Sequence, residues 1–275
     1  MNGTNNMESY LLLGFGRSYI DDCKDLIETL RHFNDNRPIN IVVLPSDVTY
    51  AQSLSLFDRV MSFDIHNHPL YPICGTKFER FGLLPRLELY KFLHTEYTIV
   101  LDTDILCSYY TNNMWNFLKT KKQELIMLGS KNNSVWHWGH WGKITSKINI
   151  QPQETHGGLF FLNKSTKLQS IFEDVKYCFL NYDKLGMLRL YQGGAVDECC
   201  FSYAFSKHKL SPVEFAEYPI MTFDIDPKED IPTKNMTENI QKRIMDNYIP
   251  FIHMFQKNHS YNFKTVKQKI LQYPT

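Results

Sequence analysis

The chain has 275 residues, of which 43% are hydrophobic and 21% are charged. These proportions are typical of a globular protein with a substantial core, and the length fits one large α/β domain spanning residues 1–275. The 30 Lys and Arg residues nearly balance the 29 Asp and Glu residues, so the net charge is +1. This balance argues against a long basic surface, and we therefore expect no nucleic-acid partner.

The N-terminal region lacks the pattern of a secretory signal. Residues 2–9 are polar, and the apolar run Tyr10–Phe15 is short and has no basic leader. No run reaches the roughly 18 to 20 apolar residues that span a bilayer. We therefore expect a cytoplasmic protein without a transmembrane anchor. Its six cysteines lack C-x-x-C spacing and are expected to be reduced core thiols.

The first part of the chain alternates strand and helix patterns. Tyr10–Phe15 and Ile39–Leu44 are short apolar runs typical of buried strands. Between them, Asp21–Phe33 carries apolar residues at helical spacing. A strand, a helix and a strand in succession predict a βαβ unit within a mostly parallel sheet flanked by helices.

Further strand and helix patterns follow. A helix beginning at Pro85 precedes a buried strand at Tyr97–Leu101, and Leu125–Gly129 resembles another strand. Residues 130–155 form a long segment rich in Trp, Gly, Asn and His. The remaining chain is expected to contain strands at Gly157–Leu162 and Pro250–His253, an irregular stretch at Pro219–Pro232, and helices near Leu168–Leu180, Asp197–His208 and Thr237–Asp246.

The triplet Asp102-Thr103-Asp104 directly follows the predicted strand Tyr97–Leu101. The carboxyl ends of parallel strands form the ligand-binding edge of an open α/β sheet, so both carboxylates can converge there on one divalent cation. Oxygen ligands suit Mg²⁺ or Mn²⁺, and such an ion binds the phosphates of a nucleoside diphosphate, which Thr103 is expected to contact. Alternatively, the two Asp residues cap a turn or helix. Burying unpaired carboxylates is unfavourable, however, and a cation offsets that cost.

An arginine-bearing segment and this strand together resemble the GT-A glycosyltransferases, especially the glycogenin-like family eight. In that family an Arg-containing helix precedes a strand ending in Asp-x-Asp, and Leu84–Tyr90 followed by Ile99–Asp104 is similar. The resemblance runs through sparse motifs and implies a GT-A type α/β fold with a Rossmann-like nucleotide-binding half. It also implies that Arg86 lies near the donor, that Asp102 and Asp104 hold Mn²⁺, and that Asp102 approaches the ribose.

Two downstream segments are similar to the same family in part. His156-Gly157-Gly158 resembles an Asn-(Ser/Ala)-Gly segment that contacts the sugar, with His in the first position. Glycine lets a backbone approach a ligand closely, although a simple strand-entry turn is the alternative. Asp197-Glu198 resembles an acidic Asp-Gln-Asp segment and could orient acceptor hydroxyls, with Asp197 as base if configuration inverts. The alternative is a pair of charges favoured at a helix N-terminus.

His253 and Lys257 form the last segment of the chain that is similar to this family. In the family a His followed by Gly and Lys supplies a third metal ligand and a phosphate contact, and Ile252–Lys257 is similar without the intervening Gly. An imidazole nitrogen is an acceptable Mn²⁺ ligand, and an ammonium group suits a diphosphate. A His that is merely hydrogen-bonded at a strand end is the alternative.

The first loop and the Trp-rich segment supply the remaining candidates. Gly14–Tyr19 lacks the third glycine of a dinucleotide fingerprint. In glycosyltransferases this loop surrounds the nucleobase, so Phe15 and Tyr19 are expected at the donor, with core or turn roles as the alternative. Trp136 and Trp138 offer flat faces for a pyranose or an aromatic acceptor, or else plug the space beneath a long loop.

These residues together predict a metal-dependent hexosyltransferase. It would move a sugar from a UDP-sugar to a hydroxyl of a glycan or protein acceptor, and the family resemblance implies retention of configuration. The alternative from another class is a non-catalytic carbohydrate-binding protein on the same fold. A sugar-1-phosphate nucleotidyltransferase fits the Gly14–Tyr19 loop poorly, and a glycoside hydrolase needs two opposed carboxylates without a metal. The sugar, the acceptor and whether the chain forms a homodimer stay open.

Overall fold

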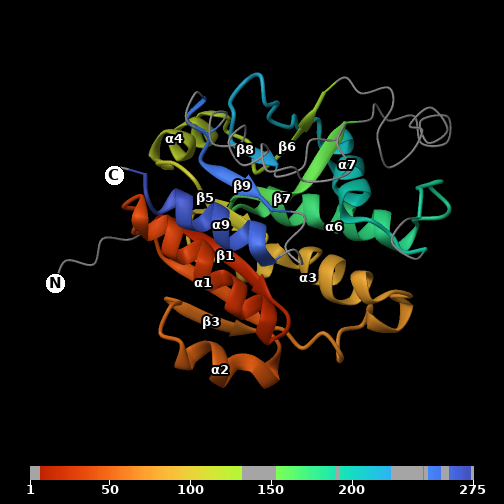
Figure 1. The fold of residues 1–275 in the computed structure, drawn as a ribbon. Helices are drawn as coiled ribbons and strands as arrows, with labels where there is room; N and C mark the ends of the chain where they lie inside the picture. Colours follow the sequence, from red (N-terminus) through yellow and green to blue (C-terminus); the bar gives the residue numbers. More distant parts are fainter. Residues whose placement is uncertain are drawn as a thin grey trace.

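A six-stranded sheet with the order β3-β2-β1-β4-β7-β6 organises the protein (Figure 1). The computed structural model describes residues 7–131, 153–189, 193–223, 244, 247–254 and 260–273. The strands of this sheet are β1 (Glu8–Gly14), β2 (Ile39–Val43), β3 (Arg59–Ser62), β4 (Tyr97–Leu101), β6 (Leu125–Ser130) and β7 (Glu154–Asn163). The first four pair in parallel, and β7 runs antiparallel to both β4 and β6. The predicted α/β class with a mostly parallel sheet is therefore confirmed.

Helices cover both faces of this sheet and enclose two separate cores (Figure 1). They are α1 (Arg17–His32), α2 (Val48–Ser53), α3 (Leu84–Arg86), α4 (Asn112–Thr120), α6 (Thr166–Leu180), α7 (Asp197–His208) and α9 (Ser260–Ile270). Leu11 and Val100 pack on the face of α6 and α7, whereas Leu12 and Ile99 pack on the face of α1, α4 and α9. Because neighbouring residues of a strand point to opposite faces, this double burial explains the uninterrupted apolar runs of the central strands.

A second, three-stranded sheet lies beside the end of β4. It has the order β5-β9-β8 and consists of β5 (Ile105–Cys107), β8 (Met221–Phe223) and β9 (Phe251–His253). β9 is antiparallel to β5, and Ile105 pairs with His253 in the register. Since β5 begins immediately after Asp104, this pairing places a residue from the C-terminal part of the chain next to the Asp-x-Asp turn.

The structure confirms most predicted elements within a few residues, corrects two of them and adds several that were not predicted. Instead of one regular helix beginning at Pro85, the chain forms a π-helical turn at Glu79–Leu83, the short α3 at Leu84–Arg86 and a 3-10 turn at Leu89–Phe92. Pro219–Pro232 was expected to be irregular, but it contains β8. The elements that were not predicted are α2, β3, β5, α4 and α9. The β3 side chains are partly or fully exposed and α4 lacks a capping side chain, so neither gives a clear sequence pattern. The predicted helix Thr237–Asp246 lies outside the described residues except for Ile244.

Two broader expectations can also be compared with the fold. All six cysteines are buried and free, as predicted for core thiols. Within the described ranges, no helix combines the length and the apolar character that crossing a membrane requires.

One ion-pair cluster ties the start of β1 to two neighbouring elements and gives a pH-dependent stability. Glu8 binds Arg37, which precedes β2, and Lys119 of α4, each at 2.5 Å. Burial raises the pKa of Glu8, but the hydrogen bonds from Lys119 and Arg37 outweigh it, and the net pKa lies below the usual 4.5. A lowered pKa stabilises the folded chain at pH values above 4.5, and this contribution disappears as the pH falls through the folded-state pKa.

Glu8→Gln is therefore expected to lower the free energy of unfolding by about 1 kcal/mol at pH 7, and by much less in strongly acidic buffer. Urea unfolding at several pH values measures this difference. Glu173→Gln, at an exposed position on α6, is the control and should change stability little at either pH. A Glu8→Gln effect that is the same at all pH values would contradict the ion-pair explanation.

Candidate functional site

The turn that carries Asp102 and Asp104 is held by both sheets. The backbone N–H of Asp102 donates to the carbonyl of Gly158 on β7 at 3.2 Å. The carbonyl of Asp104 accepts from the N–H of Met254, just beyond β9, at 2.9 Å. The turn is therefore fixed at the carboxyl end of β4, the edge where open α/β sheets bind ligands.

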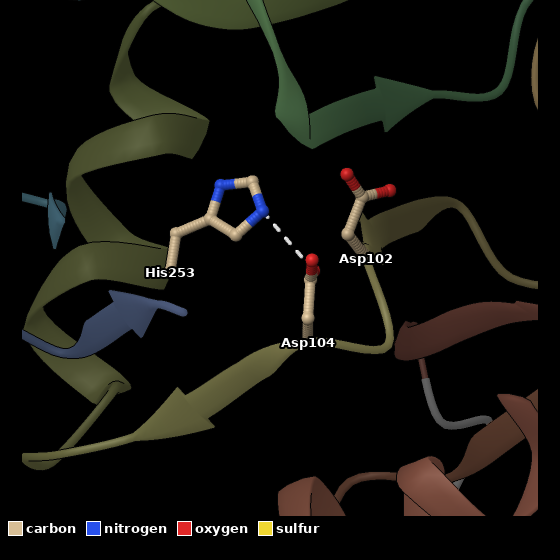
Figure 2. A group of neighbouring side chains, drawn as sticks. All are labelled: Asp102, Asp104 and His253. Atoms are coloured by element: carbon tan, nitrogen blue, oxygen red, sulfur yellow. Dashed lines mark ion pairs between the residues drawn. The ribbon is translucent and has the colours of Figure 1, made fainter. Parts of the chain in front are cut away.

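Asp102, Asp104 and His253 form a compact cluster of potential metal ligands at this edge (Figure 2). One ligand atom from each of the three lies within 4.8 Å of the other two. The His253 side chain is almost fully buried and points toward Asp104, with 3.0 Å between Nε2 and Oδ1 (Figure 2). Two of these residues come from the turn and the third from β9, so the structure brings together the three residues predicted as ligands.

The cluster fits a divalent cation in both chemistry and size. Two carboxylates and an imidazole are suitable ligands for Mn²⁺, and carboxylates suit Mg²⁺. Ligand bonds of about 2.0–2.1 Å in an octahedron place adjacent ligand atoms about 3 Å apart and opposite ones about 4 Å apart. The 3.0 Å between His253 and Asp104 matches the adjacent spacing, and the 4.8 Å outer limit needs only a small contraction.

Electrostatics also favour a positive charge within this cluster. Burial lowers the pKa of His253, but the hydrogen bond and the charge of Asp104 outweigh it, so the net pKa is raised. Burial raises the pKa of Asp102, and the negative charge of Asp104 raises it further. Arg86 lowers it, but the net pKa of Asp102 is raised. The two carboxylates thus repel one another and stabilise a cation placed between them.

Arg86 connects this cluster to the start of α7. Its side chain is 13% exposed, and its two terminal nitrogens donate separately to Asp102 and to Asp197. Burial lowers the pKa of Arg86, but the two carboxylates raise it far more, so the guanidinium keeps its charge. The sequence predicts that Arg86 lies near the donor. In the structure Arg86 forms an ion pair with Asp102, which is itself a candidate metal ligand.

Asp197 and Glu198 lie beneath Arg86, with 1% and 9% of their surface exposed. Burial raises the pKa of Asp197, but Arg86 and a hydrogen bond from Glu198 outweigh it, so the net pKa is lowered. Burial and the neighbouring Asp197 raise the pKa of Glu198 well above its usual value. The two pKa shifts run in opposite directions, because Asp197 faces Arg86 whereas Glu198 faces the charge of Asp197.

The two glycines of β7 provide space on opposite faces of the strand. A Cβ atom at Gly157 would lie 2.9 Å from both Arg86 Nη1 and Asp197 Oδ2. A Cβ atom at Gly158 would lie 2.8 Å from Nδ1 of His253. We expected glycine here to admit a ligand or to form a turn. In the structure the space is filled by side chains of the site itself.

The other predicted residues occupy different positions. Phe15 is buried and packs edge-on against Phe63, whereas Tyr19 is 50% exposed on the first turn of α1. Thr103 is buried between the two Asp residues of the turn. Trp136, Trp138 and Lys257 lie outside the described residues.

Glu79 is a supporting residue that sequence reasoning missed. It is 2% exposed, and one carboxylate oxygen accepts from the N–H groups of Gly75 and Thr76 at 2.6 and 2.9 Å. The other oxygen accepts from the N–H of Ala195 at 2.7 Å, two residues before Asp197. Thr76 Oγ1 in turn accepts from the N–H of Glu79 at 3.1 Å. This reciprocal pair is a capping box, and the Thr-x-x-Glu spacing is the signal that could have identified it.

Comparisons by sequence and by structure give different results. The sequence matches no family model and no curated protein. Among solved structures, the galactosyltransferase LgtC, in complex with donor and acceptor sugar analogues, aligns over 98% of both chains with a TM-score of 0.60 and 10% identity. LgtC is a member of the glycogenin-like family eight.

Other glycosyltransferases are also similar in structure. Mouse xyloside xylosyltransferase 1 aligns over 90% of this chain and 97% of its own, with a TM-score of 0.53 and 9% identity. GlyE of Streptococcus pneumoniae aligns over 97% of this chain and 60% of its own, with a TM-score of 0.53 and 12% identity. At such low identity these likenesses establish the fold, which is GT-A, as the sequence resemblance implied.

Gly157→Ala tests the packing of this site. The added methyl group would contact Arg86 and Asp197, so we expect the free energy of unfolding to fall by about 1–3 kcal/mol, as for other over-packed positions. Gly75→Ala is the matched control, because its Cβ would meet its nearest neighbour at 3.4 Å. Chemical denaturation measures both, and equal stabilities of the two variants would show that β7 does not need the space.

Proposed function

We propose that the protein is a metal-dependent glycosyltransferase that uses a nucleotide-sugar donor, specifically a UDP-sugar, and an acceptor hydroxyl. The observation that carries the proposal is the cluster of Asp102, Asp104 and His253 at the ligand-binding edge of a GT-A sheet. Three convergent ligand groups, two of them acidic, suit an ion that binds a diphosphate.

The ligand cluster and Arg86 would act on the donor. Asp102, Asp104 and His253 would hold Mn²⁺ or Mg²⁺, which supplies charge neutralisation to the departing diphosphate. Arg86 holds one oxygen of Asp102 by a charged hydrogen bond and thereby sets the direction of its carboxylate. Lys257 is proposed to contact the phosphates, and Phe15, Tyr19 and Thr103 to contribute to the nucleoside site.

The residues around β7 and α7 would act on the sugar and the acceptor. In the transfer, the bond between the sugar C1 and the phosphate oxygen breaks, and a bond between C1 and the acceptor oxygen forms. The proton of the acceptor hydroxyl passes to the departing diphosphate, so no further reactant is needed. We propose that configuration is retained and that Asp197, Glu198, His156, Gly157 and Gly158 position the sugar, with Asp197 acting through Arg86.

Metal binding can be tested without an acceptor. Asp102→Asn and Asp104→Asn are each expected to weaken Mn²⁺ binding in the presence of UDP by about 100-fold or more, since losing even a supporting partner of a metal ligand costs about 10- to 100-fold. Electron paramagnetic resonance of free Mn²⁺ measures the affinity. Asp64→Asn, at an exposed carboxylate on a surface loop, is the control and should bind as the wild type does.

The Mn²⁺ titration, together with assays of saccharide binding and UDP-sugar cleavage, has two decisive outcomes. If wild-type protein binds no Mn²⁺ with UDP, the proposal fails. If Asp102→Asn leaves saccharide binding intact and no UDP-sugar is cleaved by the folded wild type, the non-catalytic carbohydrate-binding alternative is correct.

Arg86→Lys tests the link between the two carboxylates. One ammonium group cannot donate in the two fixed directions that reach Asp102 and Asp197, so both carboxylates lose their alignment. We expect UDP release from the preferred UDP-sugar to fall about 100-fold, as for small misplacements of a catalytic group. Mn²⁺ affinity should fall by about tenfold, because Arg86 supports one ligand of the ion without being a ligand itself. Arg80→Lys, on the adjoining π-helical turn, is the control, and full activity of Arg86→Lys would contradict a positioning role.

A further inference from the structure

A cavity of about 220 Å³ lies beside the candidate metal cluster and is distinct from it. Three polar residues contribute to its lining, namely Ser130, Glu154 and His156. The rest of its lining is apolar or aromatic and consists of Leu128, Val213, Phe215, Tyr218, Ile220 and Met221 around Gly129. None of these described lining residues is Lys or Arg.

The walls of the cavity are fixed by contacts outside it. Val213 extends the sheet beside β6, since its N–H donates to Met127 at 2.9 Å and its carbonyl accepts from Gly129 at 3.1 Å. The Tyr218 ring stacks on Phe117 of α4 with 4.4 Å between ring centroids. Backbone pairing and stacking thus hold the Val213 and Tyr218 walls in place, which lowers the entropic cost of ordering them on binding.

His156 connects the cavity to the proposed reaction centre. It lines the cavity, and its ring packs edge-on against the ring of His253 with 5.4 Å between centroids. Nδ1 of His156 accepts the N–H of Gly158 at 3.1 Å, which fixes the ring and assigns the proton of the neutral form to Nε2. A molecule in the cavity would therefore sit one side chain away from the metal-ligand cluster.

The size and lining of the cavity identify the kind of group that fits. A cavity of about 150 Å³ with apolar walls holds benzene, whereas sites for whole small molecules usually begin at about 300 Å³. The 220 Å³ here suits one six-membered ring with a small substituent but not a nucleotide. An apolar ring gains free energy from these walls, whereas the hydroxyl groups of a sugar or the charges of a donor would lose hydrogen bonds to water.

On the basis of the proposed function, we infer that this cavity binds an apolar, preferably aromatic, ring that the acceptor carries next to its reacting sugar. The acceptor class is then an aryl glycoside or a glycan whose aglycone presents such a ring. The polar lining residues Glu154 and His156 would contact the sugar, and the apolar walls would contact the ring.

Binding of two simple probes tests this inference without donor or metal. Phenyl β-D-glucoside is expected to bind at least about tenfold more tightly than methyl β-D-glucoside, because only the phenyl ring reaches the apolar walls. Isothermal titration and saturation-transfer NMR measure affinity and the contacting protons, with the strongest saturation expected on the phenyl protons. Equal affinity of the two glucosides, or no binding of the phenyl compound, would overturn the inference.

Filling the cavity should abolish the preference for the phenyl compound. Leu128 lines the cavity and is only partly buried, so the larger ring of Leu128→Trp is expected to occupy space in the cavity. Leu180→Trp, at a 52% exposed position at the end of α6, is the matched control and should keep the preference. If Leu128→Trp does not fold, as judged by its thermal midpoint, Phe215→Ala removes a 51% exposed wall residue and should reduce the preference instead. An undiminished preference in the folded variant would contradict the assignment.

The proposed function and this inference fail in distinguishable ways. UDP release from UDP-sugars in the presence of Mn²⁺ reports on the metal cluster alone. Absence of such release contradicts the glycosyltransferase proposal, whereas release together with equal use of phenyl and methyl glucosides as acceptors contradicts only the cavity assignment.

Discussion

The site depends on one buried cation, the guanidinium of Arg86, which is shared by the carboxylates of Asp102 and Asp197. Asp102 directly follows β4, and Asp197 is the first residue of α7. The Arg86 side chain therefore joins the end of β4 to the start of α7. Carboxylates with little solvent contact are unfavourable without a partner, and Arg86 offsets this cost for Asp197 and part of it for Asp102, whose second oxygen stays available to an ion. The candidate metal cluster and the acidic pair of α7 are therefore parts of one electrostatic arrangement.

The backbone of β7 makes this arrangement sterically feasible. Gly157 leaves room for the Arg86–Asp197 pair on one face, and Gly158 leaves room for His253 on the other. Two successive glycines serve both faces because side-chain directions alternate along a strand. Glu79 adds a further constraint, since its carboxylate fixes the backbone leading into α7. The positions of Arg86, Asp197 and His253 are therefore limited by the backbone of β7 and its neighbours.

Charged and apolar recognition are separated in space. The cluster of Asp102, Asp104 and His253 suits a cation that binds a diphosphate. The cavity lined by Val213 and Tyr218 has mostly apolar walls. His156 lies between them and contacts both regions. A transferase must bind a highly charged donor and a far less charged acceptor side by side, and this division of the site matches that requirement.

The sequence by itself determined the central strands, the Asp-x-Asp turn and the α/β class, because apolar runs and their ends are local patterns that burial in a parallel sheet imposes. It also identified His253 as a ligand candidate, but only through a family resemblance. The pairing of β9 with β5 is what brings His253 to Asp104, and the pairing of β7 with β4 creates the space for Arg86. The cavity and the capping role of Glu79 toward Ala195 likewise join residues far apart in the chain. Such contacts are decided by tertiary structure, because the distance between two side chains depends on strand pairing and packing that no local pattern specifies.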